Sequence, residues 1–440
     1  METPILTPSR QWVLLAVTLL LTVSLSYFSV RNAVAERRAG SPNSAAWLRA
    51  AALEPSNPDH WYRLGRFRQL DFEHSDLNLA ISYYQRAVAL DPRAAYSWLD
   101  LAGAYEMAGD AARARDAFEK AKAAYPISSE VAWRYGNFLL RQQPSPQAFA
   151  EIRRAVTVSP TLARLATSRA WRSNPDPQVL LDQVLPASVD VYLGALDTLV
   201  AEHEGVAALA VWDRLIALQR SFELRRAFPL IDELTAQGRT GEAQRVWRQA
   251  LAIAGWMVPP QPPGSLLFDG GSEADFTEGG FGWRMRPLEG AVIEFDSAVR
   301  HGGARSLRVS FDGSANLDFA QLYQRLPVEP RTRYRFGATL RAQGISTDSG
   351  VRFLISDPQH PTEFTVMTRN VTGSQDWTLD EADFSTGPNT RLLEILLVRR
   401  PSQKLDNKIE GTVWLDDLTL TPLARRGETV DGHHFIAEAI

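Results

Sequence analysis

The chain contains no cysteine. Disulfides, thiolate nucleophiles and cysteine-ligated zinc or iron–sulfur sites are therefore excluded, and stability has to come from packing. An excess of positive charge is also lacking, because the formal net charge is -4 and the pI is near 6.0. Nucleic acid, whose binding depends on neutralising phosphates, is therefore not expected as a partner.

Sequence signatures that require an enzyme are lacking as well. The chain has no Gly-x-Ser-x-Gly elbow, no Gly-x(4)-Gly-Lys-[Ser/Thr] phosphate loop and no His-Glu-x-x-His pair. Neighbouring carboxylates such as Asp380 and Glu381 would serve a glycosidase only if a cleft held them about 5 to 10 Å apart. We therefore expect a protein that is not an enzyme, with a glycan-active enzyme carrying accessory domains as the alternative.

One long hydrophobic run is present, and it lies close to the N-terminus. From Trp12 to Val30 the chain has 19 residues without a charge, between Arg10 and Arg31. A helix of about 20 apolar residues crosses a bilayer core of about 30 Å. Residues 11–31 are therefore predicted to be a transmembrane signal anchor after a short tail, 1–10. The alternative is a cleaved signal peptide, since residues 33–35 read Ala-Val-Ala.

The segment after the anchor repeats itself. Large and small apolar residues recur at a spacing of 34 residues, which is the period of the tetratricopeptide repeat. The clearest unit is Trp98, Leu101, Ala102, Tyr105, Ala114, Phe118, Ala121 and Pro126, and the next is Ala132, Tyr135, Gly136, Leu139, Ala148, Ile152, Ala155 and Pro160. Residues 45–256 therefore resemble tetratricopeptide repeats, clean over about 58–160 and degenerate over 188–256, and predict about five helix pairs.

In repeats of this family the first helix of each pair lines a concave face that usually holds an extended peptide or a partner helix. Aromatic anchors beside isolated charges suit such a protein-binding groove. The residues that the pattern places there are Tyr62, Arg66, Tyr96, Glu106, Trp133 and Asn137. Tyr96 and Trp133 could instead pack against the next helix. A basic clamp for a peptide C-terminus is not evident.

A proline-rich linker separates this helical pattern from a strand pattern. Residues 257–264 carry four prolines in five positions, which makes a short and stiff spacer. Beyond it, alternating apolar and polar residues predict about eight short strands within 265–423, typical of a sandwich or jelly roll. Residues 424–440 form a C-terminal tail.

The strand region resembles a known family. Its motifs are Leu267-Phe268-Asp269, the Gly280–Arg284 turn, Gly302-Gly303 before Ser306, Tyr323-Gln324, and the closing Val413–Leu418. In this order they are similar to carbohydrate-binding modules of the family 4 and 9 type, within the galactose-binding-like jelly rolls. Because that fold also hosts protein binders and purely structural modules, a structural role for the β domain stays open.

The resemblance implies two kinds of site. A structural calcium would be held by Asp269 and Asp417, unless both only make local hydrogen bonds. A glycan would stack on aromatic rings and accept hydrogen bonds from polar side chains. The candidates are Trp283, Gln321, Tyr323, Gln324, Trp377 and Arg399. Trp283 and Trp414 could equally be core residues.

The sequence thus predicts a multidomain protein: a transmembrane helix, an all-α tetratricopeptide-like solenoid and an all-β jelly-roll sandwich. We expect a scaffold in a bacterial inner membrane, single-pass, with its body in the periplasm. Its partners would be a protein in the groove and a polysaccharide at the sandwich, as in exopolysaccharide or O-antigen assembly or export.

Overall fold

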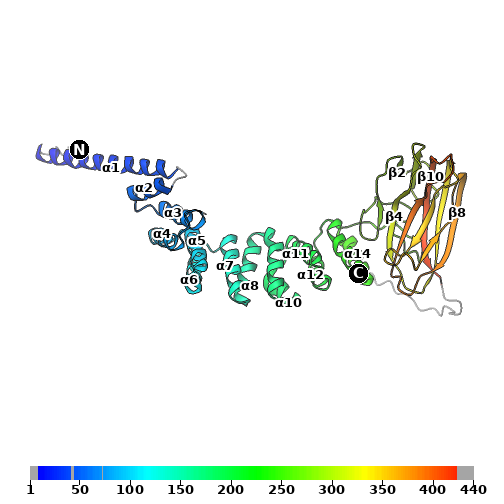
Figure 1. Ribbon diagram of the computed structural model, residues 1–440, viewed down its shortest axis with the longest axis horizontal. Helices are drawn as coiled ribbons and strands as arrows, with labels where there is room; N and C mark the ends of the chain where they lie inside the picture. Colours follow the sequence, from blue (N-terminus) through cyan, green and yellow to red (C-terminus); the bar gives the residue numbers. More distant parts are fainter. Residues whose placement is uncertain (1–7, 41–43, 72, 424–440) are drawn as a thin grey trace, which may run out of the picture. The chain divides into compact units, whose positions relative to one another are not determined.

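The computed structural model describes residues 8–40, 44–71 and 73–423, in which helices precede strands along the chain (Figure 1). It divides into two compact units, Met1–Pro186 and Ala187–Ile440. The second unit contains helices as well as the whole β-sandwich. Residues 1–7 of the predicted N-terminal tail and the whole predicted tail 424–440 lie outside the described residues.

The first unit is helical. Its α-helices are α1 (Pro8–Ala39), α2 (Ser44–Leu53), α3 (Pro58–Leu70), α4 (Leu77–Leu90), α5 (Ala95–Met107), α6 (Ala111–Ala124), α7 (Ser129–Gln142), α8 (Pro146–Val158), α9 (Ala163–Ser173) and α10 (Pro177–Val179), with short turns η1 (Pro160–Leu162) and η2 (Leu180–Val184). The pairs α3–α4, α5–α6 and α7–α8 are the predicted clean repeats, which confirms the helical-repeat fold.

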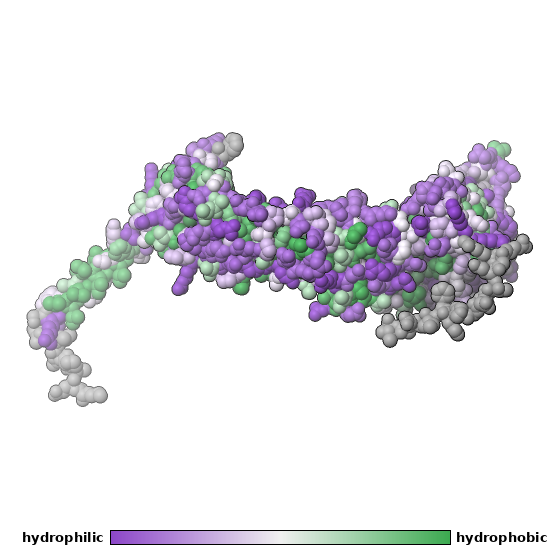
Figure 2. Space-filling view, turned by 90° about the horizontal axis from the view of Figure 1, so that it is seen from below, coloured by the Kyte–Doolittle hydropathy of each residue, from purple (hydrophilic) through white to green (hydrophobic). Residues whose placement is uncertain are grey.

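Helix α1 contains the predicted membrane-spanning segment. Its stretch Arg10–Ala39 is long and apolar enough to cross a bilayer, although a signal sequence would pass the same test. Its side chains are exposed, for example Leu20 at 68%, and they form a hydrophobic rod in Figure 2. The C-terminal end of α1 is not exposed in this way, because Ala35 and Ala39 are buried. The carbonyl of Ala39 accepts hydrogen bonds from Trp47 Nε1 (3.0 Å) and Arg63 Nη1 (2.9 Å).

Close packing holds each helix pair together. A Cβ on Gly65 would lie 2.6 Å from Cδ1 of Tyr84, and one on Gly136 would lie 2.8 Å from Cδ1 of Ile152. Real Cβ atoms do not approach so closely, so only glycine permits these crossings. Larger side chains from the second helices fill the adjacent space, with Tyr84 and Ile152 fully buried.

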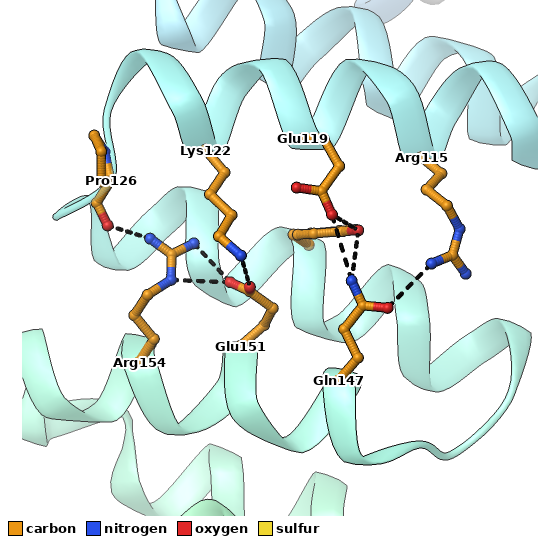
Figure 3. A network of polar contacts seen from close by, with 8 residues as sticks. Arg115, Glu119, Lys122, Pro126, Gln147, Glu151 and Arg154 are labelled. Carbon is orange, nitrogen blue, oxygen red and sulfur yellow. Dashed lines mark hydrogen bonds and ion pairs between the residues drawn. The ribbon is translucent and has the colours of Figure 1, made fainter.

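A polar network joins the second helices of neighbouring repeats, α6 and α8 (Figure 3). The buried carboxylate of Glu151 accepts hydrogen bonds from Lys122 Nζ (2.7 Å) and from Arg154 Nε (2.9 Å) and Nη2 (2.6 Å). Arg154 also donates to the carbonyl of Pro126 in the turn after α6. Charged side chains thus connect one repeat to the next across the helix surface.

The second unit begins with two further helix pairs and continues into strands. The helices are α11 (Val189–Ala201), α12 (Gly205–Ala217), η3 (Leu224–Ala227), α13 (Phe228–Ala236) and α14 (Thr240–Ile253). The strands are β1 (Trp283–Met285), β2 (Ala291–Asp296), β3 (Ser306–Asp312), β4 (Phe319–Pro327), β5 (Arg333–Ile345), β6 (Arg352–Ser356), β7 (Thr365–Met367), β8 (Gly373–Ser385), β9 (Leu392–Arg399) and β10 (Glu410–Pro422).

The strands form a two-layer antiparallel sandwich, which confirms the predicted all-β region. The first sheet has the order β1-β4-β9-β6-β7, and the second sheet has the order β2-β3-β10-β5-β8. Alternate side chains from both sheets meet in one core, with Val309, Phe336, Phe353 and Leu397 fully buried. Because side chains alternate along a strand, the residues between these core positions point outward on each sheet.

Candidate binding surfaces of the repeats and the sandwich

The first candidate surface lies on α3, with Trp47 of α2 beside it. A pocket of about 610 Å³ is lined by Trp47, Asp59, Tyr62, Arg63, Arg66, Phe67, Leu70 and Asp71. Three aromatic and four charged side chains share this lining. Tyr62 and Arg66, two of the predicted groove residues, lie in this lining.

A shared carboxylate fixes the inner helices at this pocket. Asp100 on α5 accepts a hydrogen bond from the Tyr62 hydroxyl (2.8 Å) and another from Arg134 Nη1 on α7 (2.8 Å). Arg66 Nε lies 3.8 Å from the same carboxylate. Burial, reinforced by the Asp100 charge, raises the pKa of Tyr62 to about 12. Tyr62 therefore stays a neutral hydrogen-bond donor at any physiological pH.

A second pocket lies on α5, α7 and α9. It has a volume of about 210 Å³ and is lined by Gly103, Glu106, Phe118, Trp133, Arg134, Asn137, Arg141 and Arg169. Arg141 donates to both carboxylate oxygens of Glu106, at 2.8 and 3.0 Å. Asn137 is 7% exposed, and its side-chain amide donates to the Trp133 carbonyl in the same helix (2.7 Å). Little of this amide is therefore accessible to a ligand.

The structure therefore groups five of the six predicted groove residues in two pockets. Tyr96, the sixth, is 48% exposed on α5 and lies outside both linings. Arg134 and Arg141 were not predicted. They stand seven positions apart on α7, and this spacing places both on one face of a helix, which is the signal that would have found them.

Three of the predicted glycan residues lie inside the sandwich. Gln324 is fully buried and pins the backbone of Phe268, accepting from its N–H (3.1 Å) and donating to its carbonyl (2.7 Å). Trp283 is 5% exposed, and its indole N–H donates to the Asp269 carbonyl (3.1 Å). These two side chains have little or no surface to offer a sugar, so they stabilise the sandwich.

Arg399 is also fully buried, and burial lowers the pKa of its guanidinium. It donates to the carbonyls of Leu317, Ser349 and Asn407 and to the side chain of Asn316. Three loop segments, around Asn316–Leu317, Ser349 and Asn407, are thereby fixed to the end of β9. Buried donors in proteins are normally hydrogen-bonded, and these contacts supply partners for the buried guanidinium.

Gln321 and Tyr323 do lie together, on the outer face of the first sheet. We call this surface the arginine face. Its outward residues, set by alternation with core residues and by strand register, are Arg284, Arg286, Gln321, Tyr323, Arg325, Arg352, Leu354, Ser356, Thr365, Met367, Glu394, Leu396 and Val398. The central row of this face runs Arg284, Tyr323, Leu396, Leu354 and Met367 across all five strands.

Two guanidinium groups enclose Tyr323 on this face. The guanidinium carbon of Arg286 lies 5.1 Å from the tyrosine ring centroid, and that of Arg325 lies 5.7 Å from it. Arg286 also donates to the tyrosine hydroxyl (3.0 Å), and Arg325 donates to Glu394 on β9 (2.8 Å). The ring is left 6% exposed, so the accessible chemistry of this face is mainly that of arginine.

The α13–α14 hairpin borders the same face. Arg284 donates to Asp232 of α13 (3.1 Å), and Gln359 in the loop after β6 donates to the carbonyl of Thr235 (3.0 Å). Trp247 of α14 lies edge-on to Phe268, with ring centroids 5.4 Å apart. The last helix pair is therefore part of the same packed body as the sandwich.

Trp377 lies on β8, an edge strand of the second sheet, away from the arginine face. It is half-buried, and its ring centroid is 5.6 Å from that of His301. His301 Nδ1 is 2.6 Å from Asp417 Oδ2. The predicted glycan residues thus divide among the interior and two different sheets.

The two aspartates predicted to hold calcium are both engaged by donors. Asp269 is 4% exposed, and its two oxygens accept hydrogen bonds from the backbone N–H groups of Glu273 (2.7 Å) and Ala274 (2.8 Å). Asp417 faces His301. Within residues 8–40, 44–71 and 73–423, no three His, Asp or Glu side chains gather as metal ligands do. Calcium prefers six to eight oxygens, so these residues do not fit it.

The fold and these surfaces define a class of protein, a tetratricopeptide-type repeat array joined to a β-sandwich. Sequence comparison agrees, and it confirms both predicted resemblances. Residues 71–148 match the model of the tetratricopeptide repeat, and residues 270–401 match the model of a carbohydrate binding domain. No curated protein matches the chain.

Several solved structures are similar to parts of the chain. The enzymatically active domain of bacteriophage CBA120 tailspike protein 4 is 10% identical, with a TM-score of 0.28 over 36% of this chain, and the match spans only 22% of that protein. A family 16 carbohydrate binding module is 18% identical, with a TM-score of 0.26 over 36% of this chain and 99% of the module. Pseudomonas aeruginosa pilF is 18% identical, with a TM-score of 0.28 over 53% of this chain and 92% of pilF.

Proposed function

We propose that the protein is a non-enzymatic, membrane-anchored scaffold that holds a protein segment on its repeats and a glycan on the arginine face of its sandwich. The observation that carries the proposal is the arginine face itself. It is an outward sheet surface, and it combines Gln321 and several guanidinium groups with exposed aliphatic side chains such as Met367, which is 49% exposed. The match of residues 270–401 to a carbohydrate binding domain supports a glycan as its ligand.

The two pockets on the inner helices support a protein partner. Each combines an indole, Trp47 or Trp133, with arginines, and aromatic and arginine side chains dominate the energetics of protein interfaces. The pockets lie on first helices of successive repeats, so an extended segment crossing them would meet both. Tetratricopeptide repeats are interaction modules, which agrees with this use.

The end of α1 supports an anchor that is retained. The small-x-small sequence Ala33-Val34-Ala35 lies inside the helix, Ala35 is fully buried, and α1 packs on α2. Cleavage there would remove most of a helix whose last carbonyl accepts bonds from Trp47 and Arg63. The proposed body is periplasmic, in a bacterial inner membrane, where a glycan-binding sandwich would meet polysaccharide during assembly or export.

The glycan proposal is tested with the full-length protein in detergent on an array of neutral and acidic bacterial polysaccharides. We expect binding that Gln321→Ala weakens and that Trp377→Ala, on the other sheet, leaves unchanged. Binding weakened by Trp377→Ala alone would move the site to the second sheet. No binding to any glycan on the array would overturn the glycan part of the proposal and favour a purely structural sandwich.

The groove is tested by photo-crosslinking in cells. A photoreactive amino acid at Trp133, in the second pocket, should give a defined protein adduct, whereas one at Arg115 on the outer helix α6 should not. Equal adducts at both positions would argue against a specific groove. Protease digestion of intact spheroplasts, which should cut the sandwich, checks the periplasmic orientation.

A further inference from the structure

The charges of the arginine face are not balanced. Arg284 pairs with Asp232 and Arg325 pairs with Glu394. Arg286 and Arg352 have only neutral partners among the described residues, the Tyr323 hydroxyl and the Asn370 side-chain oxygen (3.1 Å). Two guanidinium charges on this one face are therefore left without a carboxylate.

Both arginines have donors to spare. A guanidinium carries five N–H donors in a fixed fork that matches the two oxygens of a carboxylate. Arg286 is exposed, and its side chain makes one hydrogen bond within the described structure. Arg352 is half-buried, and one of its terminal nitrogens donates to Asn370. Its Nε is buried without a partner, so an anionic ligand would meet only the terminal N–H groups of Arg352.

The other side chains of the arginine face indicate which class of glycan it would bind. Tyr323, the one aromatic ring among the residues of the arginine face, is 6% exposed beneath two guanidiniums and offers no free surface for stacking a sugar. Hydrogen bonding to Gln321 and contact with Leu354 and Leu396 suit the hydroxyls and C–H groups of any sugar. The distinctive contribution comes from the arginines, which bind carboxylates far better than neutral hydroxyls.

The spacing of the two arginines indicates a chain with more than one acidic group. Arg286 follows β1 directly and Arg352 begins β6, with β4 and β9 between them. Three interstrand steps separate their backbones by about 14 Å, which exceeds one sugar ring. The two sites would then contact different residues of one polymer.

We propose that the arginine face binds an acidic polysaccharide through the carboxylates of its uronic acid residues, with Arg286 and Arg352 as the carboxylate-binding side chains. This inference rests on the proposed glycan function and names its substrate class. Binding is then strongest at low ionic strength, because the attraction between exposed charges is screened by salt.

The test uses the full-length protein in detergent and three probes: polygalacturonate, alginate and hyaluronate, each also in its carboxyl-reduced, neutral form. Affinity is measured by isothermal titration at low and high salt. We expect at least one acidic polymer to bind about tenfold or more tightly than its reduced form, because a hydrogen bond between two charged groups is stronger than one to a neutral hydroxyl. Arg286→Gln and Arg352→Gln should each lose a similar factor, and Arg352→Lys should recover only part of it.

Arg335→Gln is the matched control, because Arg335 is an arginine on the second sheet, paired with Asp383 at 2.7 Å. It changes the net charge equally and should leave the affinity unchanged. Equal binding of acidic and reduced polymers, or equal loss in Arg335→Gln, overturns the inference while the glycan function stands. Binding of none of the acidic polymers also overturns it, and the glycan array then decides whether the proposed function fails too. Melting curves of all variants exclude loss by unfolding.

Discussion

The indole of Trp247, on the last helix, lies edge-on against Phe268, which precedes the first strand, with ring centroids 5.4 Å apart. Phe281 approaches the same indole from the loop before β1, at 6.4 Å. The proline-rich segment between α14 and the sandwich therefore links two parts that also touch directly. An edge-to-face aromatic cluster of this kind adds to the stabilisation from burial alone.

The first prediction concerns this cluster. Trp247 is 5% exposed, so Trp247→Ala removes a large buried ring and leaves a cavity between helix and sandwich. We expect the free energy of unfolding of the second unit to fall by about 3–5 kcal/mol. Urea unfolding followed by circular dichroism measures it, and strand and helix signals of this unit should be lost together. A loss below 1 kcal/mol would mean that α14 and the sandwich are independent.

The second prediction uses a pair of glycines. A Cβ on Gly280 would lie 2.5 Å from two ring carbons of Trp247, and its φ of +56° also disfavours any other residue. Gly264 has a similar φ of +78° but no atom near its Cβ position. Gly264→Ala should cost about 1–2 kcal/mol from backbone strain alone. Gly280→Ala should cost clearly more in the same unfolding assay, and equal losses would contradict the packing at Trp247.

The third prediction concerns the network between repeats in Figure 3. Glu151→Ala leaves Lys122 and Arg154 without their shared carboxylate, whose side chain is only 5% exposed. We expect a loss of about 1.5–3 kcal/mol in the unfolding free energy of the repeats. Glu130→Ala, which removes a 56% exposed carboxylate 3.9 Å from Arg134, should change it by less than about 0.5 kcal/mol. Similar losses in both variants would show that the burial of Glu151 does not increase its contribution to the unfolding free energy.

The repeat array could be predicted from the sequence because its packing is local and periodic. Gly65 and Gly136 face bulky residues of their own helix pair, so the spacing of small and large residues carries the contact directly. Two strands escaped prediction for physical reasons. β8 is an edge strand that pairs only with β5 and reads mostly polar, and β1 is three residues long.

The candidate sites were harder to predict than the fold. The alternating pattern of a strand shows that successive side chains lie on opposite faces of the sheet. It does not show which of the two faces packs on the core. Trp283 therefore could not be distinguished in advance from an exposed indole. Arg286 and Arg352 lie on one face because the strands pair in the order β1-β4-β9-β6. Neighbours in this order are not consecutive in sequence, so the local sequence does not predict which residues share the face.

The fourth prediction concerns pH. Burial raises the pKa of Asp416 above its ordinary value of 3.8, although the carboxylate accepts backbone hydrogen bonds from His301 and Gly302. The folded protein therefore binds this proton more tightly than the unfolded chain does. The resulting stabilisation is fully present below the unfolded pKa and is lost as pH rises through the folded pKa.

The comparison of wild type with Asp416→Asn isolates this contribution. We expect the difference in unfolding free energy, wild type minus variant, to decrease as pH rises above 3.8, the ordinary pKa of this carboxyl group. A difference for Asp416→Asn that increases with pH would mean that the carboxylate is stabilised in its charged form.

The last prediction addresses calcium. The family resemblance predicts a structural ion at Asp269 and Asp417, but the oxygens of Asp269 already accept two N–H groups. Replacing those bonds by an ion would require a third ligand group, and the described residues supply none. We therefore expect the melting temperature to be the same in excess chelator and in millimolar calcium. A calcium-dependent rise that Asp417→Asn abolishes would instead show that the loops around both aspartates rearrange to bind the ion, with bound calcium adding stability by mass action.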